Sequence, residues 1–123
     1  MSLKFDKFIE MIRYLRGPKG CPWDQVQTFK SLSLLIIEEA YELSEAMQKE
    51  DYPNLKEEVG DVLLHVVFIV IMAEEKNVFN IENVKDTISE KMIRRHPHVF
   101  AEDKINTPEG VEKNWDKIKN YKF

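Results

Sequence analysis

The sequence lacks the features that mark secreted, membrane and nucleic-acid-binding proteins. It has a single cysteine, Cys21, so no disulfide can form within the chain. No signal peptide is recognisable in residues 1–5, and the longest apolar run, residues 66–73, is far shorter than the roughly 20 residues of a membrane-spanning helix. The net charge of −4 argues against a nucleic-acid backbone as the partner. We therefore expect a cytoplasmic protein with no membrane or nucleic-acid partner.

What the sequence does have is the composition of an ordinary globular domain. Its 123 residues are 43% hydrophobic and 33% charged, which predicts a single domain over residues 1–123. Apolar residues recur at helical spacing, and the alternation typical of strands is absent. The sequence therefore predicts an all-α fold, a helical bundle of four to five helices.

Capping and breaking residues set the limits of these helices. Residues 17–22 contain two glycines and two prolines and break the first helix, while Thr28 is a plausible N-cap for the second. Pro53 suits a first helical position, and His96-Pro97 ends the fourth helix. The predicted helices cover residues 3–16, 28–49, 53–76 and 80–95, and a short C-terminal helix starts at Thr107-Pro108-Glu109 and surrounds Trp115.

Two pairs of carboxylates lie in places where apolar residues are expected. On the second helix, Glu39 falls near the middle of an apolar stripe and Glu42 falls on its margin; the stripe consists of Leu32, Leu35, Ile36, Ala40, Leu43, Ala46 and Met47. On the third helix, Glu58 and Asp61 follow one edge of a similar stripe. Each pair is three residues apart, so its side chains are neighbours. A buried carboxylate without a partner costs several kcal/mol or stays protonated, so a compensating group is required.

A divalent cation is the simplest compensation. The loop at residues 50–52 is short, which makes the second and third helices antiparallel neighbours and brings the two acidic pairs together. A site made of oxygen atoms suits Mg²⁺, Mn²⁺ or Ca²⁺ rather than zinc, and Mg²⁺ also binds the phosphate oxygens of substrates. The alternative is a solvated acidic face with ordinary salt bridges, which is as good an interpretation for Glu38 and Glu45 taken alone.

The acidic residues and several flanking segments together resemble a known family. Glu38-Glu39-x-x-Glu42 followed by Glu58-x-x-Asp61 is similar to the signature of MazG-type all-α nucleoside triphosphate pyrophosphohydrolases. The flanking segments resemble the N-terminal type of MazG domain, and the match extends from Leu15 to Lys117; these segments are Cys21-Pro22-Trp23-Asp24, Gly60-Asp61, Arg94-Arg95-His96-Pro97-His98-Val99-Phe100 and Asn114-Trp115. Long MazG proteins carry two such domains, whereas this chain has one.

This resemblance implies both a reaction and a set of site residues. The reaction is hydrolysis of a nucleoside triphosphate to the monophosphate and pyrophosphate, with Mg²⁺ as cofactor and Mn²⁺ as a possible substitute. The metal ligands implied are Glu39, Glu42, Glu58 and Asp61. Glu38 would act with Glu39 and Glu42 in catalysis, by orienting or deprotonating the attacking water or by holding a second metal. The resemblance also implies that Lys91 and Arg95 bind phosphate and that Trp115 contacts the nucleoside.

Several alternatives stay open at this point. The substrate could be a narrower one, such as dUTP, dCTP or a phosphoribosyl nucleotide, or the chain could be a catalytically idle dimeric interaction module. A di-iron bundle would require Glu-x-x-His pairs, and none of the three histidines has a glutamate three positions earlier. Lys91 and Arg95 could simply complement the dipole of their helix, and His65 could be either a second-sphere residue or a packed histidine.

The third predicted helix also bears on the oligomeric state. Residues 62–73 are apolar on nearly all sides, so this stretch must be covered on every side. The other helices of a 123-residue chain cover it only in part. We therefore expect a homodimer or homotetramer that completes the core by pooling helices.

Overall fold

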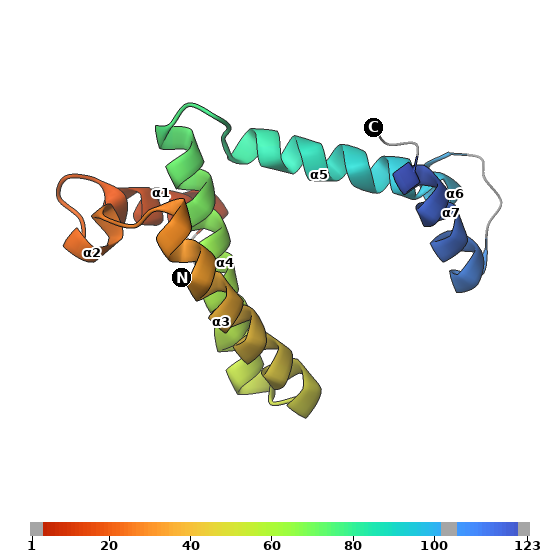
Figure 1. Cartoon of the computed structure of the whole chain (residues 1–123), viewed down its shortest axis with the longest axis horizontal. Helices are drawn as coiled ribbons and strands as arrows, with labels where there is room; N and C mark the ends of the chain where they lie inside the picture. Colours follow the sequence, from red (N-terminus) through yellow and green to blue (C-terminus); the bar gives the residue numbers. More distant parts are fainter. Residues whose placement is uncertain (1–3, 102–105, 121–123) are drawn as a thin grey trace. The chain divides into compact units, whose positions relative to one another are not determined.

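The computed structural model describes residues 4–101 and 106–120, with side chains up to Trp115 in the last helix. All regular structure within these residues is helical, in agreement with the predicted all-α fold (Figure 1). The helices are α1 (Phe5–Arg16), α2 (Pro22–Gln25), α3 (Phe29–Lys49), α4 (Tyr52–Glu75), α5 (Ile81–Arg95), α6 (Pro97–Phe100) and α7 (Pro108–Asn120). The single-turn helices α2 and α6 were not predicted. Leu3, the first residue of the predicted first helix, lies outside the described residues. None of the helices described is long and apolar enough to cross a membrane.

The chain divides into two compact units, Met1–Ile81 and Glu82–Phe123. The first unit holds the α3–α4 hairpin together with α1 and α2. The second unit holds nearly all of α5 together with α6 and α7. The predicted acidic pairs both belong to the first unit, whereas Lys91, Arg95 and Trp115 belong to the second.

Local interactions at both ends of α3 define the hairpin. At its start the Ser31 backbone N–H donates to Thr28 Oγ1 at 3.1 Å and the Thr28 N–H donates to Ser31 Oγ at 2.9 Å, which confirms Thr28 as the N-cap. At its end Glu50 adopts a left-handed conformation with φ of 51° and reverses the chain. Only Glu50 and Asp51 separate α3 from α4, so the two helices are antiparallel neighbours, as predicted (Figure 1).

The hydrophobic core of the first unit lies at one end of this hairpin. Its buried residues come from the C-terminal part of α4, from α1 and from the first turn of α3; they are Ile9, Ile12, Leu32, Val67, Phe68, Ile71 and Met72. No residue of α4 before Val67 is buried. The core therefore ends short of the segment that carries Glu58 and Asp61.

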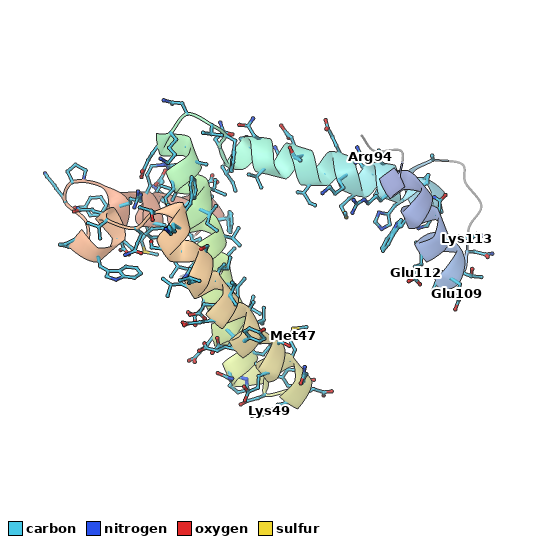
Figure 2. All side chains as sticks on the ribbon, in the orientation of Figure 1. Met47, Lys49, Arg94, Glu109, Glu112 and Lys113 are labelled. Atoms are coloured by element: carbon cyan, nitrogen blue, oxygen red, sulfur yellow. The ribbon has the colours of Figure 1, made fainter. Side chains whose placement is uncertain are left out.

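The predicted apolar stripe of the second helix is only partly covered. Leu32 and Ala46 are buried, but Ala40 is exposed. Met47, which is labelled near the end of α3 in Figure 2, is 58% exposed. The apolar stripe is therefore not buried at these two positions. The reason is that within the first unit α3 packs mainly against one helix, α4, which covers a narrower strip than the sequence pattern suggested.

Two arginines of α1 form ion pairs with the C-terminal end of α4. Arg13 makes two hydrogen bonds to the Glu74 carboxylate, at 2.9 and 3.1 Å, and Arg16 Nε contacts Glu75 at 2.8 Å. Arg16 also donates to the backbone carbonyl of Asp24 at 2.6 Å. These contacts connect α1, the α2 turn and α4, so the core end of the hairpin is held by ion pairs as well as by packing.

The tight turn after α1 generates a first prediction. A Cβ atom on Gly20 would lie 2.1 Å from the backbone oxygen of Leu15, whereas a Cβ on Gly17 would lie 3.3 Å from the oxygen of Tyr14. Gly20→Ala should therefore lower the free energy of unfolding by about 1–3 kcal/mol, as overpacking does, and Gly17→Ala should have the smaller effect. Urea unfolding of both variants checks this. Equal urea midpoints of unfolding for the two variants would contradict this prediction, because the turn would then accommodate a Cβ at position 20 without strain.

Candidate metal centre

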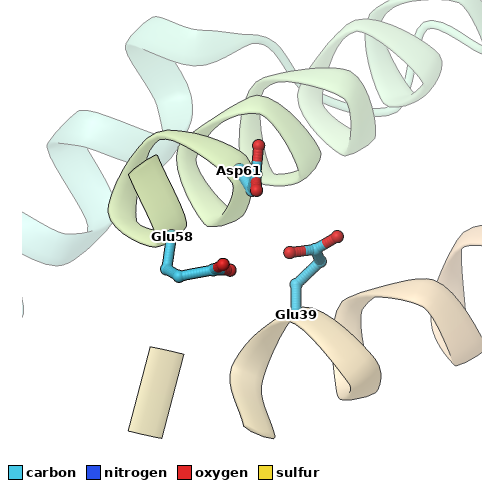
Figure 3. Close-up of side chains that lie close together, drawn as sticks. All are labelled: Glu39, Glu58 and Asp61. Carbon is cyan, nitrogen blue, oxygen red and sulfur yellow. The ribbon is translucent and has the colours of Figure 1, made fainter. Parts of the chain in front are cut away.

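Three carboxylates meet across the interface between α3 and α4. Glu39 extends from α3 toward Glu58 and Asp61, which extend from α4 (Figure 3). One oxygen from each side chain lies within 4.8 Å of the other two. The i, i+3 spacing on α4 places Glu58 and Asp61 side by side, and the antiparallel packing of α3 places Glu39 opposite them.

Two of these carboxylates carry an oxygen that has no hydrogen-bond donor. Glu39 and Glu58 are half-buried, and the Oε2 atom of each is buried without a partner among the described residues. None of the ion pairs in the described part of the chain involves Glu39, Glu58 or Asp61. A buried, ionised oxygen that has neither a donor nor a cation is destabilising, so this arrangement favours either protonation or a bound cation.

The electrostatics of the cluster agree with its geometry. Burial raises the pKa of Glu39, and the negative charges of Asp61 and Glu42 raise it further. Burial also raises the pKa of Glu58, and the charge of Glu42 is the next largest cause. Both shifts express the cost of holding negative charges together in a partly desolvated place, a cost that a bound cation removes.

The remaining acidic residues of the signature lie at different places around this cluster. Glu42 is exposed, and because it raises the pKa of both Glu39 and Glu58 it must lie beside them. It is not part of the group of three whose oxygens converge. Glu38 is exposed and also lies outside that group. The roles of Glu38 and Glu42 therefore stay predictions.

His65 lies at the edge of the cluster, one turn after Asp61. Its Nδ1 is 2.9 Å from the backbone oxygen of Asp61. Because a carbonyl oxygen only accepts, Nδ1 must carry the proton, which fixes the orientation of the ring. His65 also opposes the upward shift in the pKa of Glu39. The structure thus favours a place beside the acidic cluster over simple core packing for this residue.

The donor set fits a hard divalent cation. All three converging atoms are carboxylate oxygens, which Mg²⁺, Mn²⁺ and Ca²⁺ prefer. Oxygens on opposite sides of such an ion are about 4–5 Å apart, given bond lengths of roughly 2.0–2.6 Å. The spacing within the cluster therefore matches a shared ion, and Glu39, Glu58 and Asp61 would hold it.

The substrate-binding residues implied by the resemblance lie in the second unit. Lys91 and Arg95 are half-buried on the last turns of α5. The Nε atom of Arg95 is buried without a partner among the described residues. Trp115 of α7 donates its indole N–H to the backbone oxygen of Arg95, so the structure brings these two residues together across 20 positions of sequence. No local sequence pattern pointed to that contact.

Comparisons with known proteins establish the family. The family model described as the MazG nucleotide pyrophosphohydrolase domain matches residues 27–100, which include the three converging carboxylates. A crystal structure of a mazG-related protein from Thermotoga maritima superimposes with a TM-score of 0.75 at 32% identity and covers 94% of this chain and 98% of that one. This chain therefore belongs to the MazG nucleotide pyrophosphohydrolase domain family.

Two relatives that the chain matches are longer proteins. The nucleoside triphosphate pyrophosphohydrolase/pyrophosphatase MazG of Thermotoga maritima is 46% identical over 118 residues, which are 96% of this chain and 45% of that protein. The nucleoside triphosphate pyrophosphohydrolase of Escherichia coli K12 is 39% identical over 117 residues, which are 94% of this chain and 44% of that protein. The chain thus spans less than half the length of each.

The uncompensated carboxylates generate a second prediction. In the metal-free protein Glu39→Gln removes one of the repelling charges, so its melting temperature should exceed that of the wild type by a few degrees. Addition of Mg²⁺ should stabilise the wild type and have little effect on the variant, because a ligand stabilises only the state that binds it. Thermal melts with EDTA and with excess Mg²⁺ measure both effects.

Glu45→Gln is the matched control for this experiment. Glu45 is an exposed glutamate of the same helix, and its carboxylate pairs with Lys49 at 2.6 Å, away from the cluster. Its variant should respond to Mg²⁺ as the wild type does. A response of Glu39→Gln equal to that of the wild type would contradict a metal site at Glu39.

Proposed function

We propose that the chain hydrolyses a nucleoside triphosphate to the nucleoside monophosphate and pyrophosphate, with Mg²⁺ held by Glu39, Glu42, Glu58 and Asp61 and with Mn²⁺ as a substitute. The observation that carries the proposal is the pair of buried, unpartnered oxygens on Glu39 and Glu58, each facing other carboxylates. Membership of the MazG family supports the choice of reaction. The printed names of the relatives from Thermotoga maritima and Escherichia coli support the same choice.

The reaction needs an activated water and a stabilised leaving group. When bound, the divalent cation neutralises phosphate charge and lowers the pKa of a coordinated water. Glu38, with Glu39 and Glu42, would orient the attacking water and accept its proton. The water oxygen bonds to the α-phosphorus, the bond from that phosphorus to the bridging oxygen breaks, and pyrophosphate leaves with the electron pair.

Residues of the second unit would bind the substrate rather than the metal. Arg95 has a guanidinium suited to two parallel contacts with phosphate oxygens, and its Nε has no partner among the described residues. Lys91 lies one turn earlier on α5 and would add a second positive charge. Trp115 offers an aromatic surface for the nucleoside.

The reaction leads to a third prediction. Wild type incubated with about 5 mM Mg²⁺, a level chosen to saturate weak Mg²⁺ sites, should release pyrophosphate and a monophosphate from at least one member of a panel of ribo- and deoxynucleoside triphosphates. Glu39→Gln should lose about a hundredfold or more of this activity, as expected when one part of a charged catalytic centre is removed. Glu45→Gln should retain it.

The same panel separates the proposed reaction from its alternatives. Activity confined to dUTP or dCTP would identify a narrow substrate range for the same site. Release of orthophosphate in place of pyrophosphate would contradict the proposed bond cleavage. A complete lack of hydrolysis, with a phosphoribosyl nucleotide included, would indicate a non-catalytic module.

We further propose that two copies of the chain associate through exposed apolar stripes on α3 and α4. Three exposed apolar residues follow one stripe of α3 and three follow one stripe of α4: Leu34 (69% exposed), Ile37 (52%), Tyr41 (75%), Val59 (50%), Leu63 (37%) and Val66 (40%). A Cβ added to Gly60, beside the second stripe, would meet no atom within 4 Å apart from its own chain neighbours and helix backbone. Apolar stripes of this extent mark interaction surfaces, and a twofold arrangement would allow each copy to cover the same surface of the other.

Light scattering at micromolar concentration tests this association. Wild type should have at least twice the chain mass of 14.6 kDa. Ile37→Glu and Leu63→Glu should each shift the mass toward that of one chain, because a charge on the stripe opposes burial. Gln48→Glu, at an exposed polar position of the same helix, is the control. A wild-type mass of 14.6 kDa would exclude the association.

A further inference from the structure

A proline follows the end of α5, and side chains donate hydrogen bonds to the last carbonyl groups of this helix. Pro97 has no backbone N–H and therefore cannot continue the helix, and His96 before it has φ of −124° and ψ of 54°, outside the helical region. The last carbonyls of a helix need donors from elsewhere. Here side chains supply two of them, one from His96 and one from Trp115.

His96 folds its ring back onto its own helix. Its Nδ1 lies 2.6 Å from the backbone oxygen of Met92, and its backbone N–H donates to the oxygen of Ile93 at 3.3 Å. Since the Met92 oxygen is only an acceptor, Nδ1 carries the proton. The ring is therefore fixed at the point where α5 ends.

Trp115 packs against that fixed ring. The two ring centres are 5.2 Å apart and the planes meet at 77°, an edge-to-face arrangement that aromatic rings favour. In the same position the Trp115 indole N–H reaches the backbone oxygen of Arg95, the last residue of α5. His96 thus limits where the indole can lie, and the indole in turn occupies the carbonyl of Arg95.

This arrangement leaves one polar group of Arg95 unused. Its backbone oxygen is taken by Trp115, whereas its buried Nε has no partner among the described residues. The His98 ring also lies beside the His96 ring, with the two ring centres 5.4 Å apart. The backbone of Arg95 is therefore held by Trp115, while the Nε atom of its guanidinium has no acceptor among the described residues.

We propose that His96 is a positioning residue for nucleotide binding: by its bond to Met92 and its contact with Trp115, it holds the indole and Arg95 in the arrangement that receives the substrate. The proposal rests on the proposed function, in which Arg95 and Trp115 bind the nucleotide. His96 takes no part in metal binding or bond cleavage under this proposal. Its removal should affect substrate binding while leaving the chemical step intact.

The test uses Trp115 as an optical reporter. The chain has two tryptophans, so Trp23→Phe, which replaces a 55% exposed side chain, leaves Trp115 as the only one. In that background His96→Ala should shift Trp115 emission to longer wavelength and increase its quenching by acrylamide. For hydrolysis, KM should rise about tenfold, the effect expected from loss of one hydrogen bond and one ring contact, with kcat changed little.

Two conservative variants keep the test informative if His96→Ala folds poorly. His96→Phe retains a ring against Trp115 without the donor, and His96→Asn retains a donor for the Met92 oxygen without the ring. Each should fall between the parent and His96→Ala in emission and in KM. Val99→Ala, at a 63% exposed position of α6, is the matched control and should equal the parent.

The possible outcomes separate this proposal from the proposed function. Unchanged emission and quenching in His96→Ala would overturn the positioning of Trp115, and an unchanged KM alongside altered emission would overturn its link to substrate. Loss of kcat with an unchanged KM would also overturn it. If the parent itself hydrolyses no nucleotide, the proposed function fails, and the emission measurements still decide whether His96 positions Trp115.

Discussion

The repulsion between carboxylates across the α3–α4 interface is the constraint on which the rest of this structure depends. Glu39 and Glu58 each place an oxygen in a buried position without a donor, and Asp61 lies next to both. Packing of apolar side chains there would be more favourable for the isolated chain. The fold tolerates the acids because the hairpin is fastened outside the acidic segment, so the geometry of the cluster does not depend on attraction within it.

That fastening is found at the two ends of the hairpin. At one end the left-handed Glu50 closes a two-residue turn, and at the other end the core around Val67, Ile71 and Leu32 packs α4 against α1 and α3. Arg13 and Arg16 add ion pairs to the same core end. A site held in this way is preorganised, since its carboxylates need little movement to meet a cation. The free energy of folding therefore offsets the repulsion between the carboxylates before any ligand binds.

The sequence allowed the hairpin and its acidic pairs to be predicted because their causes are local. Thr28 caps α3 through Ser31, the short loop makes α3 and α4 neighbours, and an i, i+3 spacing pairs Glu58 with Asp61. Other features depend on packing between distant segments. The different exposure of Glu39 and Glu42 follows from how far α3 is rotated against α4, and the contact of Trp115 with Arg95 joins positions 20 residues apart. Helices α2 and α6 contain four residues each, too few for a periodic pattern to indicate them.

The orientation of α3 connects the proposed cation with the proposed second copy. Glu39 faces α4, whereas Leu34, Ile37 and Tyr41 lie roughly on the opposite side of the helix, at about 140–160° from Glu39 by about 100° per residue. A rotation of α3 about its axis would bury these three apolar residues against α4 and expose Glu39 to solvent. Both changes would stabilise an isolated hairpin. A bound cation would explain why Glu39 faces α4, but not why the apolar residues are exposed. A second copy would explain the exposed apolar residues, but not the position of Glu39. With the proposed cation on the side facing α4 and the proposed second copy on the opposite side, both sets of residues would be compensated, so metal binding and association of chains would stabilise the same conformation and strengthen each other.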